Sequence, residues 1–197
     1  MITTKTEISS DFYQRIVAKK LRICENLGLH QDPALLARSF DIFLILQRYV
    51  DDPVILKASL LCDIFEKAHL CGLPNISKDH IYQQIHGDFG SDVAELIKES
   101  SEEYAIPEFD ERKQNVLTRF TDMSEKAKWL VVVKAISDLG FFNVDILGET
   151  QRIVKEFNTD ITAYKKYYKT LFVLMTSYFR AEINSEYNEK MRVVKFN

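Results

Sequence analysis

The sequence predicts an all-α fold, built as a single-domain helical bundle that covers residues 1–197. The chain contains only 6 Gly and 4 Pro, which favours long helices with short connections over a β protein with many turns. Apolar residues recur near the helical period along most of the sequence. With 46% hydrophobic residues, the chain is long enough to bury a substantial core as one domain.

Capping residues place the first helices. A serine cap predicts a helix from residue 9 or 10 to about residue 29. In both Asp32-Pro33 and Asp52-Pro53, a capping carboxylate precedes a proline at the first helical position, so a helix is expected to begin at each proline. The helix that begins at Pro53 is expected to run without interruption to about Gly72.

The remaining helices follow from apolar periodicity and from breaks. They are expected after Ser77, after the break at residues 87–90, at about 111–120, 124–142 and 144–157, and from Asp160 to about Phe179. A polar interval at residues 100–113 interrupts the periodicity and is the best candidate for a mobile connection. The tail MRVVKFN has strand-like content but is too short to build a sheet.

Composition limits the classes of partner. The formal net charge is -3 and the chain has no basic block, so general binding to nucleic acid is not expected. Charged residues interrupt the apolar runs too often for a membrane span, and the sequence begins without the pattern of a secretion signal. Three cysteines, an odd number, suit a reducing compartment. We therefore expect a cytoplasmic protein.

Two carboxylates in one apolar run are the candidate catalytic residues. The run VILKASLLCDIFEK carries Asp63 and Glu66, which lie three residues apart and therefore share one face of the predicted helix. Cys62 adjoins them, but a free cysteine is more often a small buried apolar residue than a nucleophile or a ligand. The acid pair thus indicates a site, or the vestige of one.

This run resembles the AALLHDvvED motif of the HD-superfamily phosphohydrolases, in particular the guanosine tetraphosphate (ppGpp) hydrolase domain. The segment DHIYQQIHGDFGSDVAELIKESSEEY is similar to the FGeeVAeLV motif that follows it in this family, and AKWLVVVKAISDLGFFN is similar to a later motif, a..iKLADrlhN. The resemblance covers about residues 30–180 and implies an HD-type helical fold.

The resemblance also implies a divalent metal, which in this family is held by an early His, a His-Asp pair and a late Asp. The early His falls near Ser39 or Phe40, and Cys62 stands in place of the second His. The late Asp aligns with Ser137, or with Asp138 if the helix register shifts by one residue. We expect no metal cofactor. If the protein is active, we expect Mn or Zn, held by Cys62, Asp63 and Asp138.

A second departure concerns the charges around the expected pocket. The family's catalytic acid pair appears here as Glu66-Lys67, so one carboxylate is replaced by a cation that would oppose a nearby metal. Without a metal, the pocket could bind a nucleotide or another phosphate compound through a cationic lining, which the resemblance assigns to Arg38, Arg112, Lys113 and Lys134. The alternative is that these four are solvated charges on helix faces.

Other site types lack support in the sequence. The histidines do not have the spacing of a helical metal motif, and surface or capping roles fit them better. No GxSxG elbow, no GxxxxGK[ST] loop and no paired GxGxxG is present, which argues against kinase, P-loop and Rossmann functions.

The leading functional prediction is a catalytically degenerate HD-type domain that binds a nucleotide or phosphate ligand, or that regulates a protein partner. One alternative is an active, divergent metal-dependent phosphohydrolase of nucleotides such as ppGpp. A second is a helical protein-interaction module without a small-molecule site. The fold does not choose among them, because function depends on the site.

Overall fold

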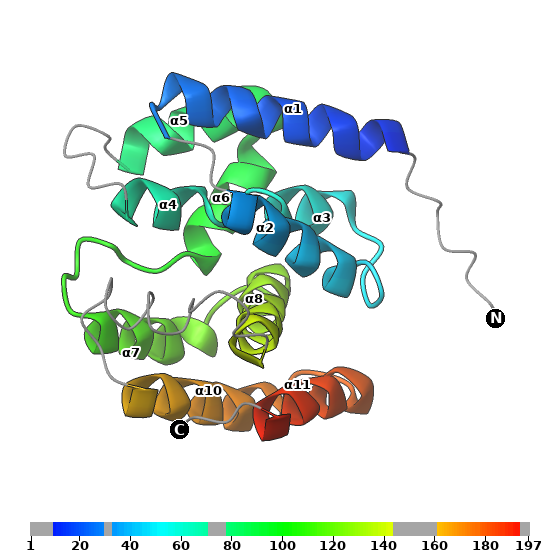
Figure 1. Cartoon of the computed structure of the whole chain (residues 1–197), viewed down its shortest axis with the longest axis vertical. Coiled ribbons are helices and arrows are strands. Elements are labelled where there is room, and N and C mark those ends of the chain that lie inside the picture. The colour runs from blue at the N-terminus through cyan, green and yellow to red at the C-terminus, as the bar shows by residue number, and fades with distance from the viewer. Residues whose placement is uncertain (1–9, 30–32, 71–77, 144–160, 194–197) are drawn as a thin grey trace. The chain divides into compact units, whose positions relative to one another are not determined.

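The computed structural model describes residues 10–29, 33–70, 78–143 and 161–193, and these residues confirm the all-α prediction (Figure 1). The chain divides into two compact units, Met1–Glu99 and Ser100–Asn197. That it forms one domain stays a prediction. The predicted helix at 144–157 and Cys71 lie outside the described residues. No described helix is long and apolar enough to cross a membrane.

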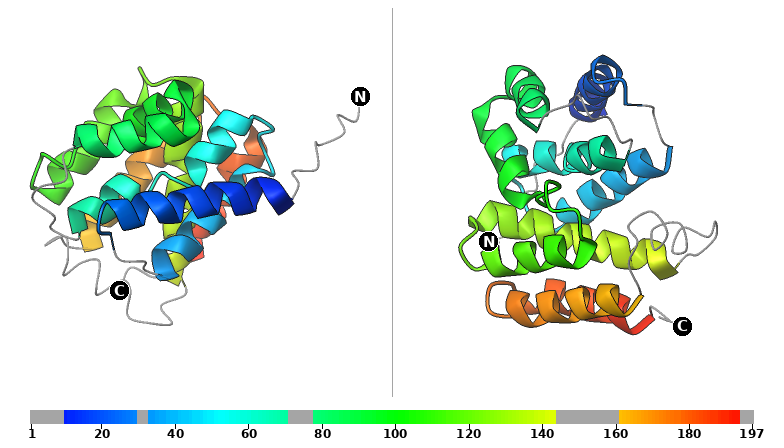
Figure 2. Two further views of the ribbon diagram at one scale, coloured as in Figure 1. Left: turned by 90° about the horizontal axis from the view of Figure 1, so that it is seen from above. Right: turned by 90° about the vertical axis from the view of Figure 1, so that its left-hand side faces the viewer.

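The first unit contains six helices among its described residues: α1 Ser10–Asn26, α2 Pro33–Leu46, α3 Pro53–Ser59, α4 Ile64–Leu70, α5 Lys78–Phe89 and α6, Ser91–Ser100, which ends at the junction with the second unit. Helix α5 packs against both α1 and α4, and α2 packs against α3. Figure 2 shows α1 and α5 side by side. The core of this unit includes Ile23, Ile42, Phe43 and Leu61, which are all fully buried.

Local sequence explains several of these boundaries. Helix α1 ends in a Schellman motif, in which Gly28 has a φ of 66° and the amide of Leu29 donates to the carbonyl of Cys24. The carboxylate of Asp52 caps α3 by accepting from the amides of Val54 and Ile55, at 2.8 and 3.3 Å. The predicted helix start at Pro53 is thus confirmed.

The prediction of one uninterrupted helix through the acid pair is wrong. Helix α3 ends at Ser59, residues 60–63 form a turn, and α4 begins at Ile64. The hydroxyl of Ser59 donates to the carbonyl of Leu56, and successive i to i+3 backbone bonds tighten the turn. Asp63 therefore lies immediately before α4 rather than in the middle of a helix, and every residue from 58 to 68 is buried.

The second unit contains α7 Phe109–Phe120, α8 Glu125–Asn143, α10 Ile161–Met175 and α11 Ala181–Val193. Helix α10 packs against α7, α8 and α11, and α11 also packs against α8. The sequence analysis missed α11 and expected strand-like character near its end. Its buried residues, Ile183 and Tyr187, are four apart and form a narrow stripe in a largely polar segment, which hid the helical period.

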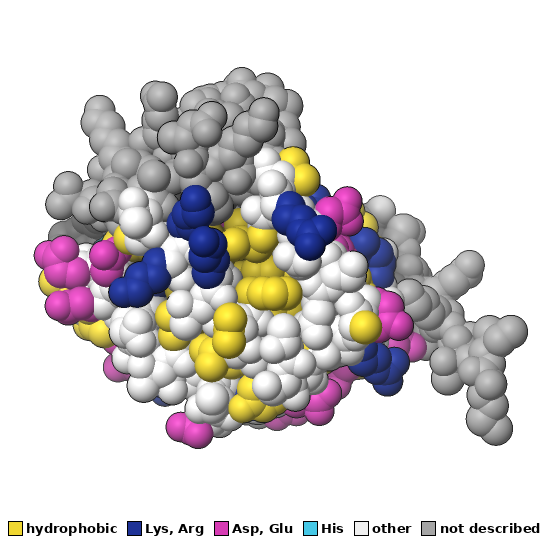
Figure 3. Space-filling model, turned by 90° about the horizontal axis from the view of Figure 1, so that it is seen from below, with side chains coloured by type: hydrophobic (Ala, Val, Ile, Leu, Met, Phe, Trp, Pro, Cys, Tyr) yellow, Lys and Arg dark blue, Asp and Glu magenta, His cyan; other side chains and the backbone are white. Residues whose placement is uncertain are grey.

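One surface of the second unit exposes apolar side chains. Val173 of α10 is 69% exposed, and Tyr178, just after α10, is 48% exposed. Figure 3, viewed from the side of α10 and α11, shows hydrophobic side chains at the surface between Lys and Arg side chains. Tyr178 also contacts the ring of Phe120 and the ammonium of Lys128, so its exposure is only partial.

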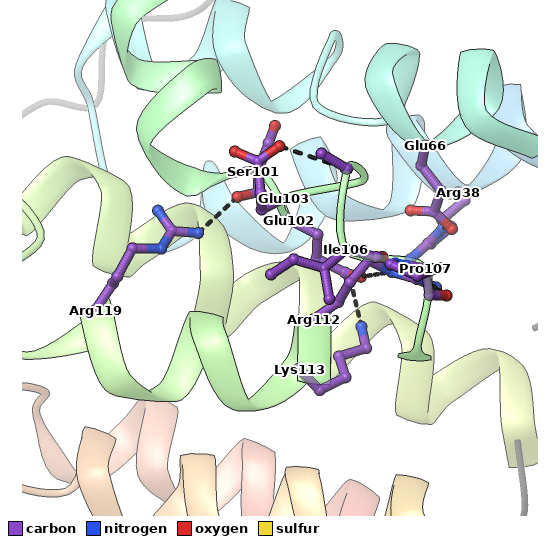
Figure 4. A network of polar contacts seen from close by, with 11 residues as sticks. Arg38, Glu66, Ser101, Glu102, Glu103, Ile106, Pro107, Arg112, Lys113 and Arg119 are labelled. Carbon is purple, nitrogen blue, oxygen red and sulfur yellow. Dashed lines mark hydrogen bonds and ion pairs between the residues drawn. The ribbon is translucent and has the colours of Figure 1, made fainter. Parts of the chain in front are cut away.

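The polar interval that the sequence predicts as a mobile connection is held against α7 by hydrogen bonds (Figure 4). The buried carboxylate of Glu102 accepts from Lys113 Nζ at 2.5 Å and from Arg112 Nε at 3.4 Å. The Arg112 guanidinium also donates to the carbonyls of Ile106 and Pro107, at 3.0 and 2.6 Å. Arg119 Nη2 likewise donates to the carbonyl of Ser101 at 2.9 Å. Two arginine side chains that reach back to the preceding backbone thus order this segment, and local polarity does not predict these contacts.

We expect Glu102→Gln to lower the free energy of unfolding by about 3 kcal/mol, because it leaves the buried Arg112 and Lys113 without their carboxylate. Urea denaturation measures the change. Glu111→Gln, at an exposed position of α7, is the matched control and is expected to change stability by less than about 0.5 kcal/mol. Equal effects of the two substitutions would contradict this role of Glu102.

Buried tyrosines give the second unit a pH dependence. Burial, followed by the negative charge of Asp138, raises the pKa of Tyr168 well above its ordinary value of 10.0. Burial likewise raises the pKa of Tyr167 and Tyr187. Because the folded state holds these protons more tightly, their contribution to stability is complete below pH 10 and is lost as the pH rises above it. Tyrosinate absorbance is expected to show these three rings ionising only as the helical circular dichroism disappears; their ionisation in the folded protein would contradict this prediction.

Candidate functional site

Three buried polar side chains from separate segments of the first unit meet at one point. The Lys20 ammonium, from α1, donates to Ser39 Oγ of α2 at 2.6 Å and to Asp63 Oδ1, just before α4, at 2.8 Å. The side chains of Lys20 and Asp63 are 4% and 2% exposed. A charged pair removed this far from water needs close partners, since each ion loses several kcal/mol of hydration. The contact therefore fixes α1 against both other segments.

Lys20 is the residue of this site that the sequence analysis missed. It lies four residues after Ile16 and three before Ile23, so it stands in the middle of the buried stripe of α1. Its neighbour Lys19 is exposed. A lone cation within an apolar stripe was the available signal, because such a charge is buried only when it has a partner.

The second acid of the candidate pair has its own cation. Arg38 Nη1 of α2 donates to Glu66 Oε1 of α4 at 2.8 Å (Figure 4). The two side chains are 16% and 11% exposed, more than those of Lys20 and Asp63. The structure thus places Glu66 in α4 and Asp63 in the turn before it, not both on one helix as expected, and provides a basic side chain for each.

A small cavity adjoins the Lys20 contact. Its volume is about 10 Å³, room for roughly one water molecule. It is lined by Lys20, Leu21, Cys24, Leu36, Asp63, Ile64 and Lys67. A nucleotide needs a far larger pocket than this cavity.

The sulfur of Cys62 is engaged by the turn that precedes α4. Cys62 is 7% exposed, and its Sγ donates to the carbonyl of Ser59 at 3.2 Å. This bond is one that a protonated thiol makes, whereas a metal ligand would be a thiolate. The contact agrees with the packing role that the sequence favours for this residue.

The donor chemistry of this group does not fit a divalent cation. Among the described residues of this group, Lys20, Arg38 and Lys67 supply three positive charges, against two negative charges from Asp63 and Glu66. The ammonium also takes the Asp63 and Ser39 oxygens as its own acceptors. Metal ligands are anionic or neutral donors, and a cation bonded to those donors weakens metal binding by repulsion, so this arrangement opposes a metal. Within the described ranges, no three His, Cys, Asp or Glu side chains converge.

The other predicted site residues lie in the second unit. Arg112 and Lys113 share the carboxylate of Glu102, and both are buried. Lys134 and Asp138 lie one helical turn apart on α8, and Asp138 Oδ2 accepts from the hydroxyl of Tyr168 at 3.3 Å. Two cationic ligand candidates of this unit therefore stabilise its own packing.

Ser137, at the expected position of the late Asp, is fully buried on α8. Its Oγ has no hydrogen-bond partner among the described residues. Asp138 is the half-buried neighbour that bonds Tyr168, which shows how strongly one step of helix register changes the environment of a side chain.

The arrangement of helices is the HD-type fold, the class that the sequence predicts. One solved structure with this likeness is a metazoan ortholog of SpoT, described as hydrolysing ppGpp and as playing a role in starvation responses. It matches with a TM-score of 0.66 and 20% identity, over 98% of this chain and 99% of that one. Another is lmo0812 from Listeria monocytogenes EGD-e, with a TM-score of 0.60 and 18% identity, over 81% and 92% of the two chains.

No protein-family model matches the sequence, and no similar sequence is found among curated proteins. At 20% and 18% identity, the structural likeness shows the fold alone. The chemistry of this chain has to be inferred from its own side chains.

We expect Lys20→Met to lower the free energy of unfolding by about 3–5 kcal/mol, because it leaves the Asp63 carboxylate buried without a cation. Adding Asp63→Leu is expected to recover part of this loss, and a double-mutant cycle by urea denaturation measures the coupling. Lys19→Met is the control: its exposed bond to the Asp88 carbonyl contributes about 1 kcal/mol or less. Strict additivity of the Lys20 and Asp63 substitutions would contradict the interaction.

Proposed function

We propose that this chain is an HD-type domain that does not hydrolyse phosphate esters and that acts as a regulatory protein binding a nucleotide or another phosphate compound. The observation that carries the proposal is the Lys20 ammonium bonded to Asp63, which the family resemblance assigns to a metal ligand, and to Ser39, one of the two residues near which it places the early His. A site that holds an internal cation there lacks the means to activate water by a metal.

Loss of hydrolysis follows from the chemistry of the step. Cleavage of a phosphate ester needs charge stabilised on the phosphate oxygens and a water made nucleophilic near neutral pH, which a divalent metal supplies. Glu66 is the candidate base, but its carboxylate is paired with Arg38. Lys67 stands where the family has a second acid, so the acid–base pair is also incomplete.

The charges around the site support an anionic ligand. The three cations of the group exceed its two carboxylates, which reverses the sign expected around a metal. Of the four side chains in the two ion pairs, that of Arg38 is the most accessible, at 16% exposed. A guanidinium matches two phosphate oxygens in one plane, so Arg38 is the group that a phosphate at the surface would meet.

The similar metazoan protein, described as hydrolysing ppGpp, suggests the ligand to try first. We expect this chain to bind ppGpp, or a related guanosine nucleotide, without turnover in the presence of Mn²⁺. Isothermal titration calorimetry measures the binding, and chromatography of the nucleotide measures turnover. Arg38→Gln is expected to weaken binding by at least about tenfold, the loss of one charge-assisted contact.

Arg48→Gln provides the matched control, because Arg48 lies just beyond α2 and is exposed. Its substitution is expected to leave the affinity within about twofold of the unmodified chain. Mn²⁺-dependent hydrolysis that Asp63→Asn abolishes would overturn the proposal in favour of an active phosphohydrolase. Absence of both binding and turnover, with ppGpp and with the other guanosine nucleotides, would overturn it in favour of an interaction module.

A further inference from the structure

We propose that the Lys20 ammonium is a permanent internal replacement for the metal of an HD-type site, and that it closes this site to divalent cations. The inference deepens the proposed function and rests on it, because both take Asp63 as a former ligand position and Ser39 as the one of the two candidates for the early His that contacts Lys20. It adds a reason why the site does not bind a metal: a side chain of the same protein occupies the metal position, and two imidazole ligands are missing as well.

The geometry of the contact suits this role. Two oxygens from separate segments, Ser39 Oγ and Asp63 Oδ1, converge on Lys20 Nζ at 2.6 and 2.8 Å. These are hydrogen-bond lengths of an ammonium, which is compact and positively charged and has three protons to donate. A divalent ion would approach the same oxygens to about 2.0–2.2 Å. The two cations therefore compete for one place, and the tethered one is always present.

The position of Lys20 in the sequence indicates that its ammonium takes the place of a metal ion and does not act as one more metal ligand. Lys20 comes from α1, whereas Ser39 and Asp63 belong to the segments that carry the former ligand positions. A serine at position 39 is much smaller than a histidine and leaves space for the end of a long side chain. Both Lys20 and Ser39 are buried, at 3% and 1% exposed, so the lysine fills interior volume.

Coulomb repulsion would exclude a metal even where some donors survive. A divalent cation at Asp63 would lie beside the Lys20 ammonium, with Lys67 lining the same small cavity. At such separations in a buried site, like charges repel strongly. Restoring imidazoles at positions 39 and 62 alone is therefore not expected to recover metal binding while Lys20 is present.

The test compares two triple variants of the full chain with Zn²⁺ and Mn²⁺ as probes. In Lys20→Ala/Ser39→His/Cys62→His, we expect metal to bind with a dissociation constant at least about 100-fold lower than in the unmodified chain, measured by calorimetry and elemental analysis. The matched control, Lys19→Ala/Ser39→His/Cys62→His, keeps Lys20 and is expected to gain less than about tenfold. Adding Asp63→Asn to the first variant is expected to abolish its gain.

Equal metal binding by the two triple variants would overturn the proposal, because Lys20 would then not be the obstacle. Stoichiometric metal in the unmodified chain would overturn it as well. Should circular dichroism show that the first variant is unfolded, the unmodified chain decides: nitrogen-15 lysine NMR is expected to show slowly exchanging Lys20 ammonium protons that excess Zn²⁺ leaves unchanged. Loss of that signal with Zn²⁺ would count against the proposal.

These outcomes are separable from those that test the proposed function. Metal uptake without hydrolysis would refute the internal cation and leave a non-hydrolysing nucleotide-binding protein standing. Metal-dependent hydrolysis would refute the proposed function itself. Failure to bind any nucleotide, together with the expected contrast between the triple variants, would leave the internal cation standing alone.

Discussion

The structure of the first unit depends on one buried contact, the Lys20 ammonium held by Asp63 and Ser39. An ammonium in the apolar stripe of a helix is unfavourable in every arrangement that leaves it unpaired. The charge therefore restricts how α1 can pack, because only a position that brings Lys20 to a carboxylate is stable. The same contact holds the turn before α4 in place, because the Asp63 carboxylate in that turn accepts a hydrogen bond from Lys20 of α1. Packing and site geometry are thus set by the same three side chains.

The second unit also buries an ion pair, but there the central group is an anion and not a cation. There a buried carboxylate, Glu102, is shared by Arg112 and Lys113, and aromatic rings complete the surroundings. Lys113 Nζ lies 4.7 Å from the centroid of the Tyr167 ring, a cation–π contact that places its stem against α10. Arg112 and Lys113, which the sequence suggests as ligand-binding residues, therefore hold the connection before α7 and the packing of α7 against α10. Arg38 differs from them, because its ion pair lies nearer the surface.

The sequence predicts well what depends on neighbours along the chain. The Asp52 cap, the proline start of α3 and the all-α class all follow from local rules, and the structure confirms them. The predictions failed where buried contacts, and not the local composition of the chain, decide the structure. The turn at residues 60–63, the ordering of residues 100–108 and the role of Lys20 each depend on bonds within buried surroundings or between segments far apart in sequence. Position 20 lies 43 residues from position 63, and nothing in either local sequence specifies the other.

Under the proposed function, the contact between Lys20 and Asp63 also explains why a carboxylate lies buried in a site without a metal. Once a buried ammonium depends on it, Asp63 has a structural role that is independent of catalysis. Removing either partner alone leaves an unpaired buried charge, so each residue protects the other against substitution. Under the proposed function, metal binding would require removal of Lys20 together with new donors at positions 39 and 62. Under the proposed function, Asp63 is therefore a poor indicator of activity, and the cation beside it is the better one.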